Sequence, residues 1–111
     1  MDDARRVKIA KTEALYRSVN EKIEGLNEAF VPVLQTMVVI CECGDDTCVE
    51  QLEVEVSLYE RVRADGTLFI VKSGHEIPEV EETVETHQHF SIVCKNKGPG
   101  EAVARQTDPR A

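Results

Sequence analysis

Three of the four cysteines in this chain lie within eight residues, and their spacing is the feature of the sequence with the clearest chemistry. Cys41, Cys43 and Cys48 form a C-x-C-x4-C pattern with a glycine inside it. Thiolates are soft donors that suit zinc, and a turn containing glycine can wrap several of them around one tetrahedral ion. The pattern therefore predicts one zinc ion at this turn, with a fourth ligand from elsewhere in the chain.

Two residues compete for the fourth position. His75 follows Gly74 at the end of an apolar run, and a strand there could run beside the cysteine turn and deliver its imidazole. Cys94 alternates with Phe90 and Ile92, where a free cysteine commonly acts as a small buried hydrophobe. A disulfide, a redox thiol or no metal at all are the remaining alternatives. The favoured zinc ligands are Cys41, Cys43, Cys48 and His75.

A shell of three cysteines and one histidine fills all four zinc positions with protein, which is typical of a structural site. Catalytic zinc keeps a position for water or substrate, so catalysis at this metal is disfavoured. His87 and His89 could form a metal or proton-transfer pair, but exposed turn histidines without a partner are the more common case. The chain has no G-x-S-x-G motif and no glycine-rich phosphate loop.

Length and charge narrow the classes of protein further. The 111 residues fit one domain, and 41% of them are apolar with no tryptophan, so the core should be mainly aliphatic. The formal net charge of −8 disfavours general binding to nucleic acid or to anionic lipid. Arg5, Arg6, Lys8 and Lys11 form the basic cluster of the chain, which we interpret as the solvated start of a helix.

The chain should be cytoplasmic by the same kind of reasoning. No apolar run approaches the roughly 20 residues that span a bilayer, and the first residues lack the apolar stretch of a signal peptide. In a reducing cytosol, closely spaced cysteines are better explained as metal ligands or redox groups than as structural disulfides.

The first element expected is an amphipathic helix over residues 7–30. Its end is predicted at Val31, because the residue before a proline is pushed out of helical geometry. One face of this helix should cover a sheet. The apolar residues that recur at intervals of three and four to form that face are Tyr16, Val19, Ile23, Leu26 and Phe30.

Two hairpins and a short helix should follow. Residues 37–40 and the alternating Leu52, Val54 and Val56 predict a first hairpin with the cysteines at its tip. Ser57 and Glu60 match a capping box, which predicts a helix to about residue 64. Residues 67–71 predict a strand, and residues 79–95 a second hairpin whose acidic first arm suits an exposed edge.

These elements predict an α+β fold, with an amino-terminal amphipathic helix packed on a small, mainly antiparallel sheet and a short central helix beside a structural zinc site. Residues 1–97 are assigned to a single zinc-binding domain. Residues 98–111 are assigned to a polar tail, which could be disordered or could form one or two helical turns over residues 101–105.

The sequence also resembles a group of small uncharacterised proteins from actinobacteria. The resemblance implies an amino-terminal helix, a cysteine-rich strand end and a Gly-His-Glu element before a valine-rich hairpin, and it favours His75 over Cys94 as a ligand. Ser73 and Gly66 depart from the prolines expected of that group. The resemblance implies no activity. The segments that carry it are residues 39–43 through Cys48, then 52–54, 57–60, 62–65, 69–71, 74–76 and 107–110.

A non-enzymatic protein-binding or regulatory module is the function that these features favour, with a protein as its partner and no membrane or nucleic-acid role. A zinc/thiol redox sensor or a metal sensor is the first alternative. In the redox form, oxidation of Cys41, Cys43 and Cys48 releases the metal. A small zinc-dependent hydrolase is the second alternative. It would keep the zinc open on the three cysteines and use His75 as a general base.

Overall fold

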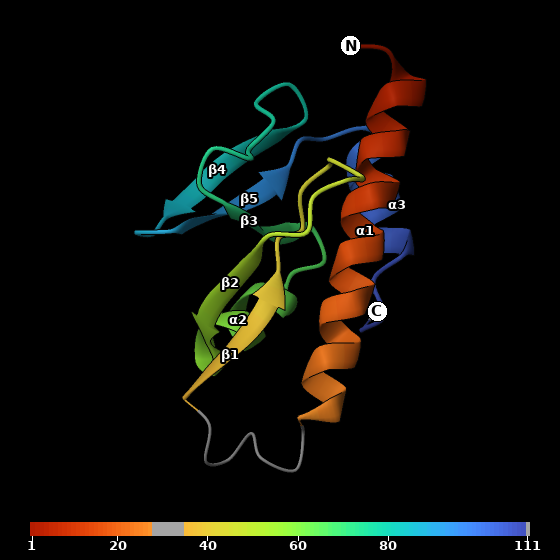
Figure 1. Ribbon diagram of the computed structural model, residues 1–111. Helices are drawn as coiled ribbons and strands as arrows, with labels where there is room; N and C mark the ends of the chain where they lie inside the picture. The colour runs from red at the N-terminus through yellow and green to blue at the C-terminus, as the bar shows by residue number, and fades with distance from the viewer. Residues whose placement is uncertain (28–34, 111) are drawn as a thin grey trace.

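The computed structural model describes residues 1–27 and 35–110, and within them the chain forms an α+β protein (Figure 1). One antiparallel sheet pairs β1 with β2, and a second has the strand order β3-β5-β4. The predicted fold class is confirmed. The elements are α1 (Asp3–Leu26), β1 (Thr36–Ile40), β2 (Gln51–Glu55), α2 (Val56–Arg63), β3 (Leu68–Lys72), β4 (Glu81–Thr86), β5 (Phe90–Lys95) and α3 (Pro99–Gln106).

The two sheets share one core, and α1 stands alongside them with α3 packed against it (Figure 1). The backbone N–H of Glu42, just after β1, donates to the carbonyl of Ile70 in β3 at 2.8 Å and so joins the two sheets. Aliphatic side chains fill most of the core, as the composition predicted. Its members include Val39, Leu52, Val54, Tyr59, Val62, Phe69, Ile70, Val71, Ile92 and Val93.

Helix α1 begins earlier than predicted. Asp2 acts as its N-cap, because the Asp2 carboxylate accepts the backbone N–H of Arg5 at 2.8 Å. The helix ends at Leu26, and the predicted boundary at Phe30 and Val31 lies outside the described residues. Neither α1 nor any other described helix combines the length and apolar character needed to cross a membrane.

The predicted apolar face of α1 is wrong in part. Val19 and Leu26 are exposed, and Tyr16 and Ile23 are only half-buried. The buried face mixes small apolar residues with three polar ones that find partners in the core, and hydrogen bonds and ion pairs make that burial tolerable. Its residues are Ile9, Ala10, Glu13, Ala14, Arg17 and Asn20.

The first hairpin is confirmed, with Val39 opposite Leu52 and Met37 opposite Val54 in an antiparallel ladder. The predicted capping box is wrong. Helix α2 begins at Val56, so Ser57 lies inside it, and Glu55 is an N-cap without a side-chain hydrogen bond. The N–H of Val56 instead donates to the carbonyl of Gln35 at 3.0 Å.

The second hairpin is also confirmed, and β4 is an edge strand as its acidic sequence predicted. A register shift between Thr83 and Glu85 places Val84 at an irregularity, and its side chain is half exposed rather than packed. Thr67 lies in the turn before β3 rather than in the strand, because its N–H donates to the Asp65 carboxylate at 2.9 Å.

Helix α3 lies within the segment that the sequence analysis assigned to a polar tail. Gly100 and Ala104 are buried against the rest of the molecule, so these turns are packed rather than disordered. Pro99 suits the first turn of the helix, where no intrahelical N–H is needed. Beyond it, Arg110 makes ion pairs with Glu21 and Glu24 of α1.

Candidate metal centre

Four predicted ligands come together in the structure. One ligand atom from each of Cys41, Cys43, Cys48 and His75 lies within 4.8 Å of all the others, and the three cysteines are buried. The Nδ1 atom of His75 is 3.6 Å from the sulfurs of both Cys41 and Cys48. Tetrahedral zinc with ordinary bond lengths would separate sulfur and nitrogen by about 3.5 Å. The group therefore has the chemistry and the spacing to hold a metal ion.

The two hairpin strands deliver the three cysteines. Cys41 and Cys43 follow β1 directly, and the N–H of Cys41 continues the β1–β2 ladder by donating to the Glu50 carbonyl at 2.9 Å. Asp45 shapes the turn that connects β1 to β2. Its carboxylate accepts the N–H of Thr47 at 2.9 Å, and its carbonyl accepts the N–H of Cys48 at 3.1 Å.

His75 reaches the cysteines from the end of β3. Its backbone N–H donates to the Lys72 carbonyl at 2.9 Å, which closes a tight turn. Gly74 within that turn has a φ of +92°, a conformation that side-chain-bearing residues rarely adopt. The Glu76 carboxylate accepts the N–H of Gly74 at 2.7 Å. The Gly-His-Glu element is therefore a turn that aims the imidazole.

A backbone donor also supports the sulfurs. The N–H of Lys72 points at the Cys41 sulfur at 3.1 Å. Hydrogen bonds of this kind stabilise negative charge on a thiolate ligand and fix its orientation. They add to the fit between these residues and a cation.

A buried carboxylate lies between two of the cysteines. Burial raises the pKa of Glu42 to about 7, although Asn20 and the Ile70 N–H donate to its carboxylate and oppose that rise. Asn20 also pairs with both backbone groups of Ile40, at 2.8 and 2.9 Å. The side chain of Asn20 thus anchors α1 to the ligand segment. Sequence reasoning missed both residues, because a polar side chain on a helix gives no sign of a partner twenty positions away.

The glycine inside the cysteine turn has a steric role. A Cβ atom on Gly44 would lie 2.6 Å from Cγ2 of Ile9 in α1 and 3.0 Å from Cδ1 of Ile77. Real Cβ atoms do not approach that closely, so the turn could not pack against α1 with a larger residue.

The three thiols interact through their protons. The thiol of Cys41 hydrogen-bonds to Cys43, and this bond together with burial raises the pKa of Cys41. The same hydrogen bond lowers the pKa of Cys43 to about 5, although burial opposes that fall. Burial also raises the pKa of Cys48. Three thiolates in one buried shell repel each other, and a divalent cation supplies the charge that lets all of them ionise.

The other residues considered from sequence lie elsewhere. Cys94 is half-buried on β5, with its sulfur 3.5 Å from the Thr67 hydroxyl, and it does not belong to the four-residue group. His87 has partners that sequence reasoning did not anticipate. Its Nε2 lies 2.8 Å from the Glu85 carboxylate, and its ring stacks on Phe90 at 4.6 Å. His89 is exposed.

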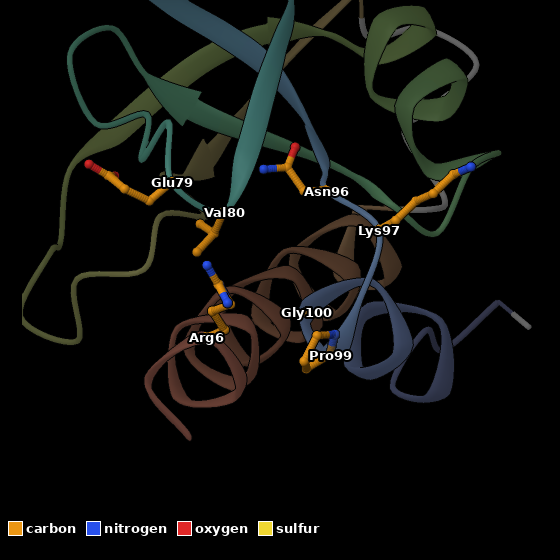
Figure 2. Close-up of a pocket in the computed structure, with 7 residues that line it drawn as sticks. All are labelled: Arg6, Glu79, Val80, Asn96, Lys97, Pro99 and Gly100. Atoms are coloured by element: carbon orange, nitrogen blue, oxygen red, sulfur yellow. The ribbon is translucent and has the colours of Figure 1, made fainter. Parts of the chain in front are cut away.

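A pocket of about 240 Å³ lies among the start of α1, the residues before β4 and the start of α3 (Figure 2). Figure 2 shows Arg6 reaching toward Val80 while Lys97 points away. The pocket contains none of the four grouped residues, and its lining includes both the acidic Glu79 and the basic Arg6 and Lys97. It therefore adds no donor to the metal centre.

The fold and the site together define an α+β protein with a Cys3His group that could hold a metal ion. No protein-family model matches the chain, and no curated protein or solved structure does either. The relationship to small actinobacterial proteins stays a prediction.

Proposed function

We propose that the chain is a cytoplasmic, non-enzymatic module that binds a protein partner and is held in shape by one structural zinc ion. The observation that carries this proposal is the closed set of four donors, three buried sulfurs and one imidazole nitrogen, within 4.8 Å of each other. Protein donors in all four positions are typical of zinc that stabilises a fold.

Zinc is the metal that best fits this donor set. Thiolates and imidazole together suit zinc, whereas calcium and magnesium select oxygen ligands. The site links β1, β2 and the end of β3, so a bound ion would tie together segments that are up to 34 residues apart. In a small domain, metal-binding energy of this kind is largely folding energy.

The same geometry disfavours the hydrolase alternative. An open zinc would leave His75 free to act as a general base and would keep the fourth position for water. Nδ1 of His75 instead lies at ligand distance from the sulfurs of both Cys41 and Cys48. The histidine is thus better suited to complete the shell than to activate a water molecule.

Two variants and a metal analysis test the ligand set. We expect the purified wild type to hold one equivalent of zinc, His75→Ala to lose most of it, and Cys94→Ala to keep it. The cobalt-substituted protein should show the spectrum of a tetrahedral site with three sulfurs and no exchangeable water. If Cys94→Ala loses the metal while His75→Ala keeps it, the ligands are four cysteines instead.

A redox sensor is the second candidate, and the closeness of the sulfurs favours it. All three sulfurs lie within 4.8 Å of each other, so two of them would have to approach by at most about 2.8 Å to reach the S–S bond length of about 2.05 Å. Hydrogen peroxide would oxidise two thiolates by two electrons, forming one S–S bond and two hydroxide ions and releasing the zinc. Zinc release in step with loss of two thiols would support the sensor. Unchanged zinc after oxidation of Cys94 alone would exclude it.

A further inference from the structure

The outer face of α1 carries apolar side chains that nothing in the described residues covers. Leu15 is 61% exposed and Leu26 is 84% exposed, with Val19 exposed between them. At 3.6 residues per turn these three positions form one stripe along the helix, on the side away from buried Asn20 and Arg17. Single exposed leucines are ordinary, but a stripe along a helix is a typical docking surface.

Basic residues flank this stripe. Arg5, Lys8, Lys11 and Lys22 are all exposed, and helical geometry puts them on the same side as Leu15. None of the four makes an ion pair with another described residue. The face defined by Arg5, Lys8, Lys11, Leu15, Val19, Lys22 and Leu26 is here named the outer α1 face.

The acidic residues of α1 point elsewhere and are already paired. Glu13 is buried and lies 2.6 Å from Nζ of Lys95. Glu21 and Glu24 form ion pairs with Arg110. The outer α1 face is therefore both apolar and positive, on a chain whose net charge is −8.

A cleft continues this face toward the metal centre. It has a volume of about 420 Å³ and lies between Arg5 and Lys8 of α1 and the turn at Gly44. Asp45 and Asp46 of that turn also line it, so this end of the face has mixed charge. The hydroxyl of Tyr16 donates to the Asp45 carbonyl at 2.9 Å and fixes α1 against that turn. The face is thus held on the same rigid unit as the four donors.

We propose that the outer α1 face is the docking surface for an acidic amphipathic helix of a protein partner. This proposal rests on the proposed binding function and names its surface. Acidic side chains would meet Lys8, Lys11 and Lys22, while apolar side chains at intervals of three and four would cover Leu15 and Val19.

Charge complementarity favours an acidic helix over a second copy of the chain, nucleic acid or an anionic membrane. A second copy of the chain that paired α1 with α1 would bring like charges together, because every charged residue of the outer α1 face is basic. Nucleic acid and anionic membrane would attract the face but would be repelled by the strongly acidic remainder of a chain with net charge −8. A folded or helical protein segment can contact the outer α1 face without approaching the acidic remainder of the chain.

A fluorescent peptide probe tests the proposal. The probe is a synthetic 21-residue helix with leucine at intervals of three and four and glutamate on its flanks, and the control peptide has lysine in place of every glutamate. Fluorescence anisotropy with the zinc-loaded protein should saturate for the acidic peptide and not for the basic one. Raising the salt concentration should weaken binding, since the contact is partly electrostatic.

Variants localise the binding. Lys11→Glu and Leu15→Ser change exposed side chains of the face, and each should weaken the acidic peptide by about tenfold. The matched controls are Lys97→Glu and Val84→Ser, which change an exposed lysine and an exposed valine elsewhere and should alter the affinity less than about twofold. Circular dichroism should show the same fold for all four.

Several results would overturn the proposal. They are no binding of the acidic peptide, equal weakening by the control variants, or Lys11-dependent binding to anionic vesicles, duplex DNA or a second copy of the chain. Failure here leaves the zinc proposal intact if the protein holds one equivalent of metal. If zinc is missing but the peptide still binds through Lys11 and Leu15, the docking surface stands without the metal.

Discussion

Two regions of the molecule bury polar or charged side chains. One is the candidate metal centre, and the other is an ionic cluster between α1 and the second sheet, formed by Glu13, Glu81 and Lys95. Both bury charged or polar groups in a chain with a thin core. At the metal centre, three sulfurs and one imidazole face each other with no cationic side chain among them. In the cluster, Nζ of Lys95 lies 2.6 Å from the carboxylate of Glu13 and 3.4 Å from that of Glu81, and all three side chains are buried.

The difference lies in where the balancing charge comes from. In the cluster, the ammonium group of Lys95 balances the negative charge of one of the two carboxylates. Burial raises the pKa of Glu13, so a proton on that carboxyl group can neutralise the second charge. The sulfurs of the candidate metal centre have backbone donors, among them the N–H of Lys72, but none of its four grouped residues is a lysine or an arginine. One region should therefore depend on an outside ion and the other on a single side chain.

Removal of the metal should have the largest effect. Structural zinc contributes on the order of 10 kcal/mol to folding in small domains, so we expect the melting temperature to fall by roughly 40 °C when a chelator is added. Hydrogen exchange should show the cysteine turn losing protection before α3 and β5. An unchanged melting temperature in protein shown to be metal-free would contradict a structural role for the ion.

The reverse test removes the cation of the ionic cluster. Lys95→Met leaves Glu13 and Glu81 facing each other in the core, and breaking a buried ion pair in this way typically costs about 3–5 kcal/mol. Urea denaturation at pH 7 measures the loss. The matched control is Lys97→Met, two residues away and exposed, which should change stability by less than about 0.5 kcal/mol.

Metal analysis of Lys95→Met then separates the two regions. The variant should keep one equivalent of zinc in its folded fraction, because Lys95 does not belong to the four-residue group. Simultaneous loss of zinc and stability would mean that the two regions behave as one cooperative unit.

A steric substitution gives a smaller effect at the metal centre. Gly44→Ala places a methyl group 2.6 Å from Ile9 of α1, and overpacking of this kind costs about 1–3 kcal/mol. Gly25→Ala is the matched control, since a Cβ there meets nothing within 4 Å and should add a few tenths to 1 kcal/mol of helix stability. Thermal melts of both variants give the comparison. An equal response of the two glycines would exclude tight packing of the turn.

The sequence predicted the grouping of the four possible metal ligands better than the ionic cluster, for a physical reason. Cys41, Cys43 and Cys48 are close in sequence and have few other roles, so their spacing alone predicts a shared site. Glu13 and Lys95 are 82 residues apart, and each is a residue type that is usually solvated. Nothing in a single sequence pairs them.

The strands and hairpins were predictable because alternation shows which face is buried, as at Leu52 and Val54. The buried face of α1 was not. Arg17 donates to the Gly66 and Ala104 carbonyls and lies over the Phe69 ring, which makes a charged residue part of the core. A hydropathy pattern counts such a residue as exposed, and so it assigned Val19 and Leu26 to the wrong side.

The smallest effect on stability is expected at the exposed ion pair between Arg61 and Glu85. This pair tests how strongly burial determines the contribution of an ion pair to the free energy of unfolding. Hydrogen bonds from Arg61 and His87 lower the pKa of Glu85 to about 2. A depressed carboxyl pKa stabilises the fold above the unfolded value of about 4.5, and that contribution is lost as the pH falls toward 2. Solvent screens this pair, so Arg61→Gln should lower the urea midpoint at pH 7 only slightly.

The titration of Glu85 should nevertheless respond. In the wild type, the NMR shift of the Glu85 carboxyl should stay constant between pH 6 and pH 4, because the group remains ionised there. Arg61→Gln removes the first donor, and the onset of protonation should move to a slightly higher pH that matches the small loss of stability. A wild-type carboxyl half protonated near pH 4.5 would show that Arg61 and His87 do not hold it in solution. A large drop in stability on Arg61→Gln would instead mean that this surface pair contributes as much as the buried cluster.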